Sequence, residues 1–339
     1  MTTLVTGATG FVGGNLARAL VERDEEVRVL VRQTSNDLAI RDIKTTRMIG
    51  DLLAPESLRE AVDGCDTVYH CAANYSFWSR QRDDIYQTNV RGTQNLLRAA
   101  RSAGVRRVVF TSSVSTIGLP YSNSPDPDGP LGSEEMPPQP SHLVGSYKQS
   151  KYQAEQLAVA ESDENFHVVV VNPCAPVGAW DVKPTPTGRI PLDFARGRIP
   201  GYLSTGMNLI DVADVAQGHI LAMEHGKPGE RYILGNRNLT LLQVFNILSE
   251  ITGRRPPRIR FPHWLVMAVA YCDQWLESDL MRREPSIPVE GIKITRHPMY
   301  VSSTKAIDEL GLPQTPVETA LEKSIRWFSD YGYLPNRPS

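Results

Sequence analysis

Three glycines spaced three residues apart constrain the fold of this chain more than any other feature. Gly7, Gly10 and Gly13 separate a β-rich run, 2–6, from a stretch of helical character, 15–23. In such a strand–turn–helix unit the first glycine permits the tight turn, the second admits a pyrophosphate, and the third lets the helix pack closely on the strand. The free backbone N–H groups at the start of the helix and the helix dipole then favour the binding of phosphate groups. The segment predicts a dinucleotide site.

The first 172 residues alternate short apolar runs with helical stretches, a pattern typical of a parallel, doubly wound sheet. After residue 172 a Pro/Gly-rich crossing runs to about residue 206, and from Thr240 the chain is mostly helical. The expected fold is therefore α/β, a Rossmann-type doubly wound parallel sheet with a smaller, mostly helical C-terminal substrate domain. The expected strands lie at 2–6, 27–31, 46–49, 67–70, 108–111 and 168–171, and a long helix is expected at 85–103.

The change of texture also predicts the domains. A cofactor-binding domain comprises 1–172 plus about 207–235, and a substrate domain comprises 173–206 and 236–335. The run 264–272 is the most apolar in the chain, but its nine residues fall short of the ~20 that span a bilayer. We expect it to pack in the core of the smaller domain. The alternative is a lid over an apolar substrate or a contact with a membrane surface.

Composition excludes some classes of partner. The chain has 339 residues and a net charge of −2, so nothing favours binding to nucleic acid or to an anionic membrane. The cysteines lack metal-ligand spacing, which predicts free thiols, no metal and a reducing, cytoplasmic setting. The cofactor strand begins at residue 2 without a basic and apolar leader, as expected of a cytoplasmic protein. The four cysteines are Cys65, Cys71, Cys174 and Cys272.

Tyr147 and Lys151 lie four residues apart in a stretch, 146–160, that has no internal proline or glycine and reads as helix. Residues at i and i+4 share one face of a helix, so the ammonium group lies beside the phenol. A free phenol has a pKa of about 10, and a neighbouring cation lowers it. A phenol tuned in this way can exchange a proton with a carbonyl or alcohol oxygen. The pair is a candidate acid-base site.

Six segments, in this order, resemble the motifs of the extended short-chain dehydrogenase/reductase family, within the NAD-dependent epimerase/dehydratase superfamily. The resemblance spans nearly the whole chain and implies a small-molecule substrate, with a homodimer formed through the helices of Asn89 and Tyr147. The segments are Thr6-Gly-Ala-Thr-Gly-Phe-Val-Gly13, Asp51-Leu52, His70-Cys-Ala-Ala73, Asn89-Val-Arg-Gly-Thr93, Phe110-Thr-Ser-Ser-Val114 and Tyr147-x-x-x-Lys151.

The resemblance also implies roles for single residues. Ser113, or its neighbour Ser112, would hydrogen-bond the substrate oxygen, and Tyr147 would transfer the proton. Lys151 would lower the pKa of the tyrosine and bind the nicotinamide ribose. Asn89 would be either a proton relay or a structural residue. Tyr75 and Trp78 are candidate substrate contacts. The implied cofactor contacts are Gly7, Thr9, Gly10, Phe11, Val12, Gly13, Asp51, Leu52, Ala72, Ala73, Tyr147, Lys151 and Pro173.

Arg32 discriminates between the two nicotinamide cofactors. The second strand should end beside the adenosine ribose, where NAD enzymes usually offer a carboxylate and an arginine suits the 2′-phosphate of NADP. Residues 31–34 contain no carboxylate, and the planar, permanently charged fork of Arg32 can bind a phosphate. The sequence therefore favours NADP. The alternative is a solvated arginine with NAD bound.

Two further resemblances point to different reactions. The segment 168–178, with Asn172 and Pro173, resembles plant dihydroflavonol and cinnamoyl-CoA reductases, which favours an NADP(H)-dependent reductase of an aldehyde or ketone, reversible as an alcohol dehydrogenase. Segments 183–189, 208–215 and 230–235 resemble bacterial hopanoid-associated sugar epimerases. The alternative is thus a nucleotide-sugar epimerase or dehydratase with tightly bound NAD, linked to hopanoid lipid biosynthesis. A non-catalytic NADP-binding regulator is a third reading, which an intact Ser113, Tyr147 and Lys151 oppose.

Overall fold

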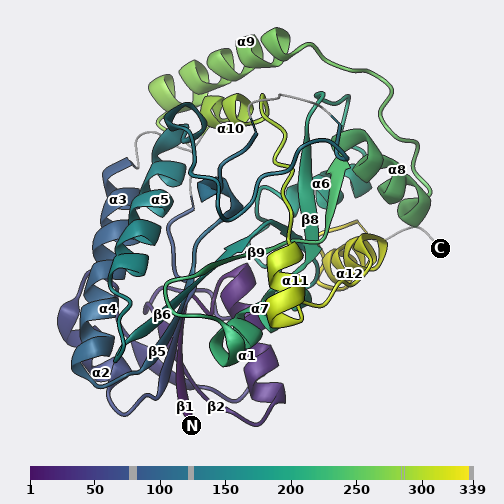
Figure 1. Cartoon of the computed structure of the whole chain (residues 1–339). Coiled ribbons are helices and arrows are strands. Elements are labelled where there is room, and N and C mark those ends of the chain that lie inside the picture. The colour runs from purple at the N-terminus through teal and green to yellow at the C-terminus, as the bar shows by residue number, and fades with distance from the viewer. Residues whose placement is uncertain (76–81, 121–125, 284, 286, 336–339) are drawn as a thin grey trace.

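Short runs rich in β-branched residues build the main sheet. The computed structural model describes residues 1–75, 82–120, 126–283, 285 and 287–335. Within them, seven strands form one parallel sheet in the order β3-β2-β1-β4-β5-β6-β9 (Figure 1). This confirms the predicted Rossmann-type sheet. The strands are β1 (Thr2–Thr6), β2 (Glu26–Val31), β3 (Thr46–Ile49), β4 (Thr67–His70), β5 (Arg107–Thr111), β6 (His167–Pro173) and β9 (Arg231–Leu234).

Helices cover both faces of this sheet, because successive side chains of a strand point to opposite faces. In β5, Val109 belongs to the buried cluster formed with α1 (Phe11–Glu22) and α7 (Val212–His225). Its neighbours Val108 and Phe110 belong to the cluster on the other face. The helices of that second face are α2 (Pro55–Val62), α4 (Gly92–Ser102) and α5 (Gly145–Ala160).

The strand order reverses direction at β1. β2 pairs with one side of β1 and β4 with the other, both in parallel. In doubly wound sheets a crevice opens at such a switch point, outside the carboxyl ends of the strands, and ligands bind there. The turn after Thr6 and the loop after His70 therefore meet at the same place.

A smaller sheet, which was not predicted from the sequence, and most of the remaining helices form the rest of the molecule, and the predicted helical character of the C-terminal region is confirmed. β8 (Gly206–Asp211) pairs with β7 (Ala175–Val177) and with β10 (Arg237–Thr240). Since β8 belongs to this sheet, the chain returns to the main sheet with α7 and β9, a few residues later than the expected position of about 207. The other helices are α3 (Arg82–Tyr86), α6 (Arg189–Ala195), α8 (Leu241–Thr252), α9 (His263–Asp273), α10 (Val289–Ile294), α11 (Thr304–Leu310) and α12 (Val317–Asp330).

The apolar run 264–272 is not core, and the prediction that it packs inside the smaller domain is wrong. It forms α9, which lies across the top of the molecule, far from the main sheet (Figure 1). Ala270 is buried, but Trp264 and Tyr271 are 70% and 52% exposed. The physical reason is that α9 packs along one stripe only, mainly on α10. Among the described residues, no helix is long and apolar enough to cross a membrane.

Close packing of α1 on β1 depends on a glycine. A Cβ atom on Gly13 would lie 2.4 Å from the carbonyl oxygen of Gly7 and 2.7 Å from its carbonyl carbon. Both are backbone atoms, so no side chain could move aside to make room. The third glycine of the motif therefore has the packing role that the sequence assigns to it.

Replacing Gly13 by alanine should lower the free energy of unfolding by about 1–3 kcal/mol, because the methyl group forces α1 away from the turn. Gly291→Ala is the matched control, since a Cβ atom there meets no heavy atom within 4 Å. In its helix that change should be neutral or stabilise by up to about 1 kcal/mol. Urea denaturation of the three proteins measures both effects. Equal stability of Gly13→Ala and the wild type would contradict the close packing.

Candidate active site

The turn after β1 is shaped to hold a pyrophosphate. Gly7 has φ of +73°, and a Cβ atom there would lie 2.6 Å from the backbone nitrogen of Ala72. Helix α1 begins at Phe11, and no side chain caps its first turn. The N–H groups of that turn are thus available to phosphate oxygens. A dinucleotide fits this cradle, with Thr9, Gly10 and Val12 also in the turn.

The loop after β4 is held in place by a buried histidine. His70 hydrogen-bonds the hydroxyl groups of Thr6 (2.8 Å) and Thr93 (2.9 Å), which ties β4 to β1 and α4. Burial, with the nearby Lys151 charge, lowers the pKa of His70 to about 3, so the ring is neutral at physiological pH. The backbone nitrogen of Ala72 donates to Thr6, and Ala73 follows. This arrangement fixes the second wall of the crevice.

Asn89 holds the next residues of the same loop. It lies in a π-helical turn, η2 (Gln87–Arg91), between α3 and α4. Its side-chain oxygen accepts from the nitrogen of Asn74 (2.7 Å), and its amide donates to the oxygen of Asn74 (3.1 Å) and to Ser150 (2.9 Å). Since both ends of the amide are engaged, the geometry favours the structural role over the proton relay.

Ser113 and Tyr147 meet at the carboxyl end of β5. Burial raises the pKa of Tyr147 and a hydrogen bond with the Ser113 side chain offsets part of this rise, which leaves the pKa at about 12. Ser112, the other candidate, is buried and faces Thr116 instead. The ring of Tyr75 lies 4.4 Å from that of Tyr147, so this expected substrate contact borders the phenol. Trp78 lies outside the described residues.

Lys151 is buried beneath this pair. Its ammonium group donates to the carbonyl oxygen of Thr111 (2.6 Å) and lies 4.5 Å from the ring of Phe110. Burial lowers the pKa of Lys151, and the charge of Glu155 offsets part of this decrease, which leaves the pKa at about 8. The sequence predicts a lysine that lowers the pKa of Tyr147. In this structure burial dominates instead and the pKa of the phenol is raised, because the cation points at β5.

The expected adenosine end of the site lies beyond β2 and β3. Arg32 follows β2 directly and is exposed, and it forms no ion pair with another described residue. The Asp51 carboxylate accepts from the nitrogen of Leu53 (2.9 Å), and Leu52 is buried against Gly92. A role of these residues in cofactor binding stays a prediction.

A buried polar network behind Ser113 was not foreseen from the sequence. The amide of Asn172 donates to Glu155 (2.7 Å), to Thr116 (2.9 Å) and to the backbone oxygen of Ser113 (3.1 Å). Arg231 of β9 pairs with the other oxygen of Glu155 at 3.1 Å. Pro173, an expected cofactor contact, follows Asn172 and is buried at the end of β6. The available signal was Glu155 itself, which lies one helical turn beyond Lys151 on α5.

The groups expected to act together thus lie together. Ser113, Tyr147 and Lys151 meet beside the glycine turn, with Tyr75 at the rim. All four cysteines are free thiols. Within the described part of the chain, no cluster of three or more His, Cys, Asp or Glu could hold a metal ion.

Residues 3–235 match the model of the NAD dependent epimerase/dehydratase family. The chain belongs to this family. The motifs identified in the sequence resemble the same superfamily, so that prediction is confirmed. As the description of the family states, its chemistry depends on a nicotinamide cofactor.

Three relatives of this family are similar over almost their full lengths. The "Putative dihydroflavonol 4-reductase" of Synechocystis is 42% identical over 334 residues, 97% of this chain and 95% of that protein. Sterol demethylase protein B of Methylococcus capsulatus is 35% identical over 335 residues, 98% and 100% of the two chains. The crystal structure of gox2253 is 40% identical and covers 98% of this chain and 99% of its own, with a TM-score of 0.85. The chain is therefore an oxidoreductase of the extended short-chain dehydrogenase/reductase type.

The stability of the protein should depend on pH through Lys151. Its folded pKa of about 8 is below the ordinary value of 10.5, so between these values the unfolded chain binds more protons. The free energy of unfolding should then rise with pH in this window, by up to about 3 kcal/mol. Lys151→Met should remove this rise, and the exposed control Lys44→Met should retain it.

Urea denaturation at several pH values between 7.5 and 10.5 measures this effect as the difference between wild type and variant. Taking the difference cancels the titration of other buried groups that do not interact with Lys151, such as Lys148. The same pH slope in the wild type and in Lys151→Met would contradict the burial of this cation.

Proposed function

We propose that this chain is an NADP(H)-dependent oxidoreductase that reduces an aldehyde or ketone to an alcohol, and catalyses the reverse reaction. The observation that carries the proposal is the hydrogen bond between Tyr147 and Ser113, with Lys151 buried one helical turn away, at the sheet edge that also holds the glycine turn. When a hydride reaches a carbonyl carbon, the carbonyl oxygen must gain a proton, and such an arrangement can supply it.

The roles of the residues follow from their chemistry. The nicotinamide supplies the hydride when it is bound. With a pKa of about 12, the Tyr147 hydroxyl is protonated at neutral pH and can give its proton to the carbonyl oxygen of the substrate. Ser113 hydrogen-bonds the same oxygen and stabilises the charge that develops there. In the oxidative direction the alcohol returns its proton to Tyr147.

Lys151 would support both partners of this reaction. An ammonium group has three N–H donors, and one is used by Thr111. The other two would serve the nicotinamide ribose and the phenolate that remains after proton transfer. A bond to the phenolate would favour the charged form, so the pKa of Tyr147 would fall when the site is complete.

The substrate is proposed to be an apolar alcohol or ketone. Tyr75 is 45% exposed and its ring lies tilted beside that of Tyr147, so it offers an aromatic surface next to the reacting oxygen. Two relatives carry names that refer to polycyclic compounds, a dihydroflavonol and a sterol. Both names support a rigid, multi-ring substrate for this chain.

The alternative is a nucleotide-sugar epimerase or dehydratase with retained NAD, which the description of the family favours. Such an enzyme needs cations for a sugar-nucleotide pyrophosphate, and the sequence offers Arg189, Arg237 and Arg255. Arg237 is paired with Glu318 at 2.6 Å, which weakens its candidacy. Conversion of a nucleotide sugar without added cofactor and without net redox change would establish this alternative.

Replacing Tyr147 by phenylalanine should lower kcat for carbonyl reduction by about 10²–10⁴-fold, because the proton donor is lost. Affinity for the nicotinamide cofactor should change little. Tyr152→Phe, on the same helix and half-buried, is the matched control and should keep full activity. Steady-state kinetics on a panel of cyclic ketones, with cofactor titration by fluorescence, measures both quantities. Full turnover by Tyr147→Phe would refute the assignment.

Arg32 should make the protein prefer NADPH to NADH. A charge-assisted bond from its guanidinium to the 2′-phosphate is worth roughly 1.5–3 kcal/mol, or about ten- to hundredfold in affinity. Arg32→Gln should lose this preference by weakening NADPH alone, whereas the exposed control Arg59→Gln should keep it. Titration of nucleotide-free protein with both cofactors measures the ratio. Equal affinity of the wild type for NADH and NADPH would contradict NADP as the cofactor and favour the epimerase.

A further inference from the structure

Large apolar side chains cover the outer surface of α9 and of the π-helical segment that continues it, η5 (Gln274–Leu280). Trp264 is 70% exposed, and Trp275 and Leu280 are each 64% exposed. Soluble proteins rarely gather so many large apolar side chains on one exposed surface without a partner for them. The exposed set, here called the α9 face, is Trp264, Leu265, Val269, Tyr271, Trp275, Leu276 and Leu280.

This segment is apolar on both of its sides. The stripe that packs on the rest of the molecule holds Val266, Met267 and the buried Ala270, together with His263 and Asp273, which are hydrogen-bonded to the α10 region. On a helix that packs on a core in water, the opposite side is polar. Here the opposite side carries the large exposed apolar side chains. This second apolar side indicates that the outer surface meets an apolar phase.

Positive charge flanks the α9 face at both ends. Arg258 and Arg260 precede it, Arg282 and Arg283 follow it, and all four are exposed. Between residues 254 and 296 there are eight Lys or Arg against five Asp or Glu, although the whole chain has a net charge of −2. Basic side chains beside exposed apolar residues complement anionic lipid headgroups, and Trp and Tyr favour the interface between headgroups and acyl chains.

We propose that the α9 face docks on the surface of an anionic lipid bilayer, with α9 and η5 lying in the plane of the interface. A second copy of the chain fits this surface less well. A two-fold contact through α9 would place arginine against arginine, whether the helices ran parallel or antiparallel, because both ends are basic. A bilayer neutralises both ends at once.

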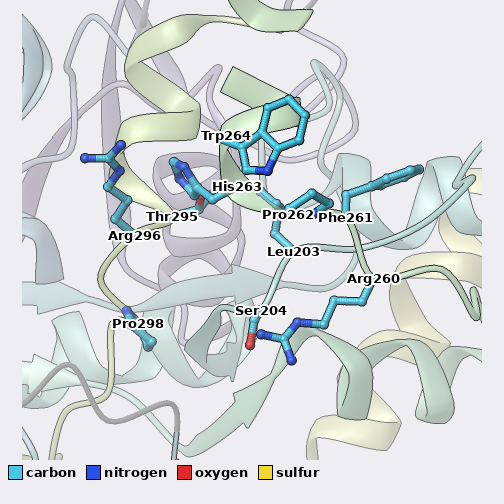
Figure 2. A pocket seen from close by; sticks show the side chains of 10 residues that line it. All are labelled: Leu203, Ser204, Arg260, Phe261, Pro262, His263, Trp264, Thr295, Arg296 and Pro298. Carbon is cyan, nitrogen blue, oxygen red and sulfur yellow. The ribbon is translucent and has the colours of Figure 1, made fainter. Parts of the chain in front are cut away.

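Docking would place the active site close to the membrane. α10, the main neighbour of α9, contacts the start of the helix that carries Tyr147, since Glu290 accepts a hydrogen bond from the backbone of Ser146. A pocket of about 440 Å³ opens beside the first turn of α9, and Trp264, Arg296 and Arg260 are among the residues that line it (Figure 2). An apolar substrate dissolved in the bilayer would then reach the protein on this side. The docking itself does not depend on the proposed reaction.

Co-sedimentation with vesicles tests the proposal on the full chain. The wild type should bind vesicles of phosphatidylcholine with phosphatidylglycerol, and should bind pure phosphatidylcholine at least about tenfold more weakly, since the charged contribution is lost. Trp275→Ala combined with Leu280→Ala should lower binding to the anionic vesicles by at least about tenfold. Arg282→Glu combined with Arg283→Glu should lower it similarly. The controls, Leu53→Ala and Arg59→Glu, change exposed residues of the first domain and should bind as the wild type does.

Further readouts separate the possible outcomes. Trp264→Phe combined with Trp275→Phe should lose any blue shift of tryptophan fluorescence on adding vesicles, with unchanged thermal unfolding. Failure of the wild type to bind, or equal binding by the Trp275/Leu280 variant, would overturn the proposal. A third result would also overturn it: the wild type does not bind vesicles, sedimentation velocity shows that it is a dimer, and the Trp275/Leu280 variant is a monomer. The α9 face would then join two copies of the chain. Ketone reduction in detergent-free buffer is measured separately, so loss of docking and loss of the proposed reaction remain distinguishable.

Discussion

The hydrogen bond from the ammonium group of Lys151 to the carbonyl oxygen of Thr111 holds the candidate site together. A buried cation is costly unless acceptors compensate for the lost water. Here the carbonyl oxygen at 2.6 Å and the ring face of Phe110 do so. The bond fixes the rotation of α5 against β5. Tyr147, one turn earlier on that helix, therefore meets Ser113 where β5 ends.

A second layer of buried polar groups supports this arrangement. Glu155 lies one turn beyond Lys151 and receives hydrogen bonds from Asn172 and Thr116 and an ion pair from Arg231. Through Glu155, α5 is thus joined to β6, to β9 and to the turn that follows Ser113. Both oxygens of the Glu155 carboxylate are engaged in it. The position of the Ser113 hydroxyl therefore depends on residues from several distant segments of the chain.

The main sheet and the helical C-terminal region differ in how far they bury their apolar side chains. The main sheet buries its strands between helices on both faces, as in β5, where alternate residues enter opposite clusters. The helical end buries one apolar stripe of α9, at Ala270, and leaves Trp264 and Trp275 on the other side exposed. A surface that is costly in water becomes favourable against lipid, which is why the same feature suggests a membrane as a partner.

The sequence by itself determined six strands of the main sheet, the glycine turn and the order of the motifs, because each can be recognised from residues that are near neighbours in the chain. Gly13 and the Tyr147–Lys151 spacing could be interpreted from a strand, a turn and one helical face. Tertiary structure alone decided the rest. It placed Ser113, and not Ser112, beside the hydroxyl group of Tyr147, bonded the Asn89 side chain to the backbone of Asn74, and directed the Lys151 ammonium group at Thr111. It also left 264–272 on the surface, since an apolar run has the same sequence whether a neighbour covers it or not. Which side chains are buried, and which groups they hydrogen-bond, depends on segments far apart in the chain. The local sequence pattern therefore cannot predict them.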